Sequence, residues 1–145
     1  MTSAPLLLPA LALVAWTLVM LLWTAGTRFP AMGRAGIDLS KATPGGRGQD
    51  LDPVLPPLVS WKSHNHTHLH EQPTLFYAVV GALAIMGAAS PMNVVLAWTY
   101  VGLRVAHSLW QATVNRLPVR FALFALASLT LIALTVSALT TALSG

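Results

Sequence analysis

The chain has 145 residues, of which 55% are hydrophobic and 8% are charged, and its mean hydropathy is +0.68. This composition is too apolar for a soluble domain of such length and indicates a small integral membrane protein. The absence of cysteine excludes disulfides, a cysteine nucleophile and a cysteine-ligated metal site. The net charge of +4 comes from scattered basic residues rather than from a cluster that would bind nucleic acid.

The first predicted membrane span covers residues 5–26. An apolar helix of this length crosses the ~30 Å hydrocarbon core of a bilayer. A cleaved signal peptide is the alternative interpretation. No basic residue precedes the apolar run, however, and the run is longer than the apolar region of a typical signal peptide. We therefore expect a retained transmembrane helix.

A long polar loop is predicted next, over residues 28–62. Proline and glycine interrupt it repeatedly, as in Pro44-Gly45-Gly46 and Pro56-Pro57. Its five basic residues outnumber its three aspartates. Basic loops stay in the cytoplasm under the positive-inside rule, so we expect this loop to be cytoplasmic.

Three further membrane spans are predicted, over residues 65–88, 93–114 and 118–143. The turn at residues 90–93 is uncharged, whereas the connection at residues 115–118 carries an arginine. The chain 1–145 is thus predicted to be a single all-α membrane domain, a bundle of four transmembrane helices. Both termini would be extracytoplasmic.

The third span carries an arginine and a histidine. Arg104 and His107 are three residues apart, and Tyr100 and Gln111 would share their helix face. A charge at bilayer depth costs about 2.5–3.5 kcal/mol on insertion scales and needs a partner. Glu71 of the second span lies at a similar predicted depth, so we expect a buried ion pair between Glu71 and Arg104. A pair that only fixes helix register is the alternative.

Further polar groups converge on the cytoplasmic end of the predicted bundle. We expect Arg116 and Arg120 to lie at the mouth of the region that holds Glu71 and Arg104. One carboxylate among several cationic donors favours a pocket for an anionic or zwitterionic molecule. Grooves facing the lipid would suit an apolar second substrate.

Four histidines around the start of the second span raise the alternative of a metal site. His64 with His68, and His66 with His70, have the i, i+4 spacing of paired helix ligands. Histidines at a membrane interface are also common as solvated residues. Because no second acidic residue lies in the membrane to complete a carboxylate-bridged site, we predict no metal.

Three motifs occur in order along the last three spans. They are Asn65…Glu71-x-Pro73-x-x-Phe76-Tyr77, Ala97-Trp98…Arg104-x-x-His107, and Asn115-Arg116-Leu117-Pro118-Val119-Arg120. Together they resemble the membrane-associated proteins in eicosanoid and glutathione metabolism (MAPEG), particularly the bacterial branch. The resemblance implies a homotrimer of four-helix subunits, in the inner membrane of a bacterium. Glutathione, the co-substrate, would bind near the cytoplasmic face, between subunits.

The resemblance also implies roles for individual residues. Arg120, two residues after Pro118, matches the arginine that stabilises the glutathione thiolate. A cation beside sulfur lowers the thiol pKa and stabilises the anion. The residues expected to bind glutathione are Asn65, His68, Glu71, Arg104, His107, Gln111 and Arg116.

The chain departs from the family pattern at several positions. His68 replaces an asparagine, Gln111 a tyrosine, and Phe121 and Phe124 replace hydroxyl-bearing residues. Two functions therefore stay open. One is a membrane glutathione transferase or peroxidase acting on hydrophobic electrophiles. The other is a non-catalytic membrane subunit of similar fold that binds lipid or a partner protein.

Overall fold

The protein is described by a computed structural model over residues 4–144, and the described residues contain helices and no strand. This confirms the predicted all-helical class. Two 3-10 turns, Leu39–Lys41 and Gly48–Leu51, lie in the long loop. The α-helices are α1 (Ala4–Arg34), α2 (Pro57–His68), α3 (Gln72–Ile85), α4 (Pro91–Thr113) and α5 (Leu117–Ser144).

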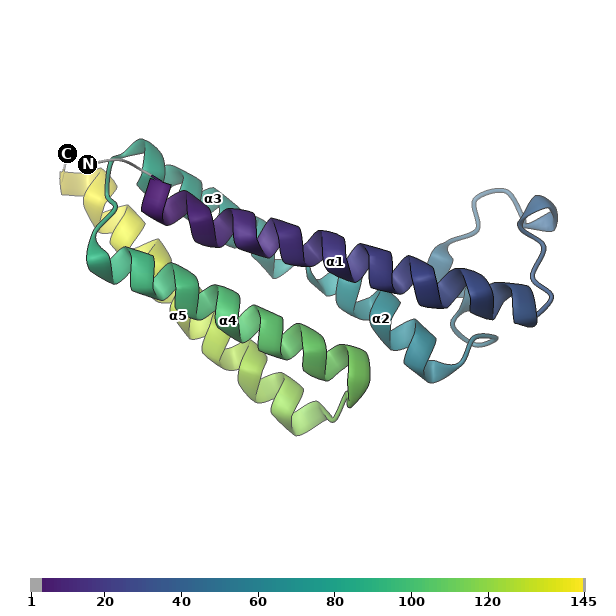
Figure 1. The fold of residues 1–145 in the computed structure, drawn as a ribbon. Helices are drawn as coiled ribbons and strands as arrows, with labels where there is room; N and C mark the ends of the chain where they lie inside the picture. The colour runs from purple at the N-terminus through teal and green to yellow at the C-terminus, as the bar shows by residue number, and fades with distance from the viewer. Residues whose placement is uncertain (1–3, 145) are drawn as a thin grey trace.

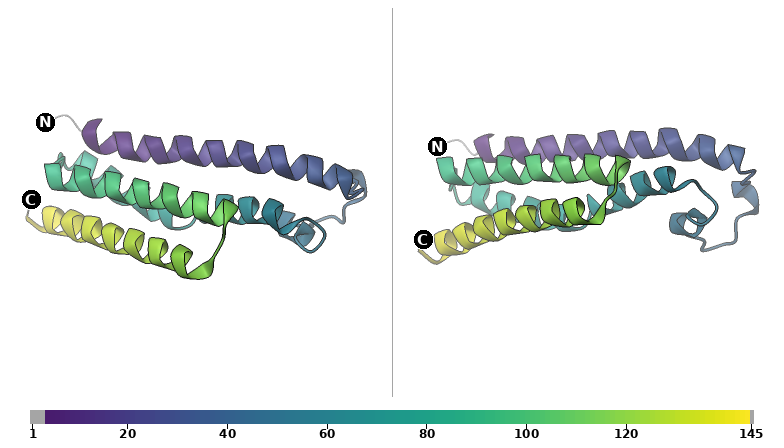
Figure 2. Two further views of the ribbon diagram at one scale, coloured as in Figure 1. Left: turned by 60° about the horizontal axis from the view of Figure 1, so that its bottom comes forward. Right: turned by 90° about the horizontal axis from the view of Figure 1, so that it is seen from below.

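The helices form four antiparallel helical segments, called legs below (Figure 1). α1 runs toward the long loop, α2 and α3 return as one interrupted leg, and α4 and α5 complete the bundle. Both ends of the chain lie at the end opposite the long loop, as all three views show (Figures 1 and 2). α1 and α5 are long and apolar enough to cross a membrane. An even number of legs puts both termini at one end.

The first helix is longer than predicted. The sequence suggested a span over residues 5–26 and a loop over 28–62, but α1 continues to Arg34 and α2 begins at Pro57. The end of α1 is set by Gly36, whose φ of +68° suits glycine. Around it, the Ile37 N–H bonds the Met32 carbonyl and the Gly36 N–H bonds the Gly33 carbonyl, as in a Schellman motif. The irregular segment is therefore only residues 35–56.

The predicted second span, over residues 65–88, is two helices rather than one. α2 ends at His68 and α3 begins at Gln72. The cause is Pro73, which has no N–H to donate and whose ring would clash with the carbonyl four residues earlier. Glu71 adopts φ −88° and ψ −95° between the two helices. At this break the carbonyl of His68 accepts from the N–H of Glu71 at 3.4 Å instead of from the N–H of residue 72, as it would in a continuous helix.

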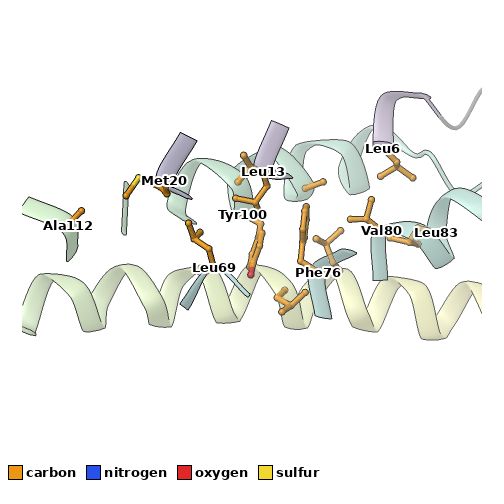
Figure 3. Close-up of a cluster of buried hydrophobic side chains, with 14 residues drawn as sticks. Leu6, Leu13, Met20, Leu69, Phe76, Val80, Leu83, Tyr100 and Ala112 are labelled. Carbon is orange, nitrogen blue, oxygen red and sulfur yellow. The ribbon is translucent and has the colours of Figure 1, made fainter. Parts of the chain in front are cut away.

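The core follows one stripe of α1. Leu6, Leu13 and Met20 are fully buried at seven-residue intervals. They pack toward α3 and α4, where the Phe76 and Tyr100 rings stack with their centroids 4.4 Å apart (Figure 3). Since lipid tails are as apolar as leucine, such contacts stabilise a membrane bundle by close packing rather than by the hydrophobic effect. They also fix the mutual register of α3 and α4.

The long loop is fastened to the bundle by one aspartate. Asp52 lies 3.7 Å from Arg28 of α1 and 2.6 Å from the Nε2 atom of His64 of α2. Arg28 also donates through Nη2 to the carbonyl of Gly48. Segment 35–56 is thus tied to two helices.

Candidate functional site

A cavity of about 310 Å³ opens at the break between α2 and α3, against α4 and the first turns of α5. This volume lies at the lower end of the range for small-molecule sites. Five residues predicted for the site line it, namely His68, Glu71, Arg104, His107 and Arg120. Gln72, Leu117, Phe121 and Phe124 complete the lining. The structure thus brings together residues from three legs of the bundle.

Arg104 is the most enclosed charge in the cavity. It is 1% exposed, and its Nη2 atom donates to the backbone carbonyl of His68 at 2.9 Å. Its Nε atom is buried without a hydrogen-bond partner. A buried donor of this kind is costly unless something accepts its proton. The residue that lines the cavity is therefore a buried cation with one N–H that has no partner in the described chain.

The predicted ion pair between Glu71 and Arg104 is absent: no nitrogen–oxygen pair within 4.0 Å joins them in the described chain. Glu71 instead lies 3.9 Å from the Nε2 atom of His68, and its side chain is 62% exposed. The helix break explains the difference. At the break the His68 carbonyl accepts both from the Glu71 N–H at 3.4 Å and from the Arg104 guanidinium, and the exposed Glu71 side chain lines the same cavity.

His68 is oriented by Gln111. The Nδ1 atom of His68 lies 3.1 Å from the amide oxygen of Gln111, which is 1% exposed. Because an amide oxygen only accepts, Nδ1 carries the hydrogen. Nε2 then faces Glu71 and the cavity. Gln111 was predicted to bind glutathione directly, but it does not line the cavity and contacts it through His68.

Asn65 lies in a separate polar cluster. It is fully buried, and its Nδ2 atom donates to the Ser108 hydroxyl at 2.7 Å. The indole Nε1 of Trp16 donates to the same oxygen at 3.0 Å. The hydroxyl thus joins α1, α2 and α4. Asn65, also predicted to bind glutathione, does not line the cavity, because Ser108 takes its amide.

The turn between α4 and α5 separates the two arginines of the third motif. Asn115 has a positive φ of 53°, and its Oδ1 atom accepts from Nη1 of Arg120 at 2.7 Å. This holds Arg120 at the cavity wall. Arg116 was predicted for the site, but it is exposed and does not line the cavity. Its carbonyl accepts from the Trp110 indole at 3.1 Å, which keeps it in the turn.

The histidines of α2 and of the turn that follows it have different partners. His64 bonds Asp52, His68 bonds Gln111, and His70 contacts the carbonyl of His66. Over residues 4–144, no group of three or more histidine, aspartate or glutamate side chains is placed to hold a metal ion. The i, i+4 spacing of the histidines therefore does not assemble a ligand set in this structure.

Sequence reasoning missed Gln72. Its Nε2 atom donates to the Ser128 hydroxyl at 2.8 Å, and its Oε1 atom accepts from the Tyr100 hydroxyl at 3.3 Å. It lines the cavity and also an apolar groove between α3 and α5. The one available signal was a lone amide at the start of a long apolar run.

Comparison with known proteins identifies the family. The model of the MAPEG family matches residues 6–140. Searches of curated proteins and of solved structures returned no significant match. The match spans all four legs, including the two helices long and apolar enough to cross a membrane. The chain therefore belongs to the MAPEG family and is a membrane protein.

Proposed function

We propose that the protein is a membrane-bound, glutathione-dependent transferase or peroxidase acting on hydrophobic electrophiles. The observation that carries the proposal is the buried cation in the cavity. Arg104 and Arg120 supply two guanidinium groups against one carboxylate, that of Glu71, and Arg104 keeps an unpaired buried Nε–H. Such a cavity favours an anion that also carries a positive group, and glutathione has two carboxylates and an ammonium.

The proposed reaction begins at the thiol. The thiol proton of glutathione passes to water, and the guanidinium of Arg120 stabilises the thiolate that remains. In a transfer, the sulfur forms a bond to the electrophilic carbon and the leaving group departs with its electron pair. With a hydroperoxide, two glutathiones are oxidised to the disulfide, and the peroxide is reduced to an alcohol and water.

The other side chains of the cavity would bind the peptide. Arg104 is placed to take a carboxylate, and Glu71 to take the ammonium group. His68 and His107 line the same space, and their rings lie 6.5 Å apart between centroids. Phe121 and Phe124 line the same cavity and would give it an aromatic wall.

We further propose the assembly that this chemistry needs. The cavity would face the cytoplasm, where glutathione is abundant, in the inner membrane of a bacterium, with both termini on the other side. The exposed side of Glu71 leaves room for a neighbouring subunit. A homotrimer would close the cavity there, with glutathione between subunits.

Titration of glutathione into the purified protein in lipid nanodiscs tests the proposal. We expect binding in the millimolar range or tighter, weakened about tenfold or more in Arg120→Ala. Arg116→Ala, a neighbouring arginine off the cavity, is the matched control and should bind like the unmodified chain. Conjugation of a hydrophobic electrophile should be lost in Arg120→Ala. Equal effects of the two substitutions, or no binding, would refute the proposal.

A second candidate is a non-catalytic subunit that binds lipid or a partner protein. It is favoured by one observation: no serine, threonine or tyrosine is among the residues that line the cavity in the described chain. A thiolate there would receive no hydroxyl hydrogen bond. Glutathione binding without conjugation or peroxide reduction, together with co-purification of a larger complex, would support this candidate.

A further inference from the structure

The imidazole of His68 lies between two cavities. It lines the cavity that holds Arg104 and Arg120, and it also lines a smaller one of about 190 Å³, called the loop-side cavity below. The residues that line the loop-side cavity are all polar, namely Gln49, His64, Thr67, His68 and Glu71. Three of these five are exposed, so water has access to this side of the ring. His68 therefore lies between the proposed glutathione site and water.

The hydrogen bonds of His68 leave Nε2 without a partner in the described chain. Nδ1 lies 3.1 Å from the amide oxygen of Gln111 and carries the hydrogen of the neutral ring. Nε2 lies 3.9 Å from a carboxylate oxygen of Glu71, which is too far for a hydrogen bond. With the hydrogen on Nδ1, the lone pair is on Nε2. The geometry thus supplies a proton acceptor at the cavity wall.

The charges around His68 determine when it can hold a proton. The arginines of the cavity oppose a further positive charge on the ring, whereas the carboxylate of Glu71 favours one. Transfer of a thiol proton to Nε2 forms an anion and a cation side by side, so the net charge of the cavity does not change. The ring is therefore expected to gain its proton together with formation of the thiolate. The titratable and charged groups that face it are Glu71 from the turn, His64 from α2, Arg104 and His107 from α4, and Arg120 from α5.

We propose that His68 is a catalytic residue, which accepts the thiol proton of glutathione, and that Gln111 is its positioning residue. This rests on the proposed function and names the group that takes the proton before water does. The S–H bond breaks, its electron pair stays on sulfur, and an N–H bond forms at Nε2. The sulfur then bonds to the electrophilic carbon, and the leaving group departs with its electron pair. Finally, Nε2 returns the proton to water in the loop-side cavity.

Counting protons tests this assignment. Glutathione is added to the protein in nanodiscs, near neutral pH, in a weakly buffered solution of a pH indicator. The ultraviolet absorbance of the thiolate measures how much thiolate forms. S-Methylglutathione has no thiol proton and gives the baseline for other protons that move on binding. For the unmodified chain we expect less than about half a proton released per thiolate, because the imidazole retains the remainder.

His68→Gln removes the proton acceptor but keeps the backbone carbonyl that binds Arg104. We expect this variant to release about one proton per thiolate and to form the thiolate at least about tenfold more slowly in stopped-flow measurements, because water then takes the proton directly. His66→Gln is the matched control. His66 is a partly buried histidine of the same helix that lines neither cavity, and its variant should behave like the unmodified chain.

Gln111→Met tests the positioning role. It keeps the imidazole but removes the amide oxygen that orients it. We expect thiolate formation to slow about threefold or more, with no change in the proton count or in the affinity for S-methylglutathione. An unchanged rate would overturn the role of Gln111.

The proton count in the unmodified chain remains decisive even if His68→Gln does not fold. One proton released per thiolate by the unmodified chain would overturn the inference. A rate and a count in His68→Gln that match those of the unmodified chain would also overturn it, since another group would then take the proton. Absence of any glutathione binding would refute the proposed function itself. Binding and thiolate formation with full proton release would refute only the role of His68.

Discussion

Arg104 of α4 donates from Nη2 to the backbone carbonyl of His68, 2.9 Å away at the end of α2. A guanidinium buried at this position is matched by a carbonyl that an unbroken helix would have used internally. The helix break before Pro73 therefore shapes the cavity, because the His68 carbonyl accepts from the Glu71 N–H at 3.4 Å and from Arg104 rather than from the N–H of residue 72.

Replacing Arg104 should weaken the binding of an anion. Arg104→Met removes the buried charge and the charged donor to the His68 carbonyl, and hydrogen bonds to charged groups contribute about 1.5–3 kcal/mol. We expect glutathione affinity to fall tenfold or more by calorimetry. Arg104→Lys should recover part of the lost affinity, because lysine keeps the positive charge but lacks the planar guanidinium group. Arg34→Met, at the exposed end of α1, is the control. Unchanged affinity in Arg104→Met would contradict the assigned role.

Removing the Ser108 hydroxyl should destabilise the bundle without affecting the cavity. Ser108→Ala leaves two donors without an acceptor, the buried Asn65 amide and the partly buried Trp16 indole. Each such group costs about 1–3 kcal/mol. Unfolding in mixed micelles should show the loss of stability, and the affinity for glutathione should not change. Thr99→Ala on α4 should be near neutral, because Thr99 is exposed and bonds only its own helix. A parallel loss of affinity would place Asn65 in the site after all.

The side chain and the backbone of Asn115 have separable effects. Asn115→Gly keeps the positive φ but removes the oxygen that holds Arg120. We expect a roughly two- to tenfold loss of glutathione affinity with little change in stability. Asn115→Ala should lose similar affinity and also about 1–2 kcal/mol of stability, because alanine is strained at this φ. If both variants bound glutathione normally, Arg120 would not depend on Asn115.

We expect the burial of Lys62 to make the stability of the protein depend on pH. Its Nζ atom bonds the carbonyl of Leu58 and lies 5.2 Å from the centre of the Trp23 ring, and burial lowers the pKa of this lysine below 10.5. Between the folded and unfolded pKa values, the unfolded chain binds more protons, so stability rises with pH. The burial penalty is thus present at neutral pH and relieved toward pH 10.5.

The comparison with Lys62→Met isolates this effect. The Tm of the unmodified chain relative to Lys62→Met should increase from neutral pH to about 10.5. Lys41→Met is the control, because the side chain of Lys41 is 83% exposed. The Tm difference between Lys41→Met and the unmodified chain should not change with pH. A Tm difference that is constant for Lys62→Met would show that this lysine loses no proton affinity on folding.

Much of the fold could be predicted because membrane insertion depends on local composition. Apolar runs of about 20 residues satisfy their backbone only as helices in lipid, so the number and direction of the legs followed from the chain itself. Proline and glycine positions were harder to interpret. Pro73 breaks a leg that its apolar pattern predicted as continuous, whereas Pro30 is accommodated inside α1.

The sequence by itself determined that this is a helical membrane protein of the MAPEG family with several charged and polar groups among its apolar spans. Only the tertiary structure decided how those groups are partnered. Residue spacing places Glu71 and Arg104 at similar depth, but rotation of each helix and the break after His68 decide which atoms meet. The same rotation buries Asn65 against Ser108, leaves Arg116 exposed and brings Gln72 to the cavity. Depth depends on counting residues along one helix, whereas contact depends on packing between helices distant in the chain.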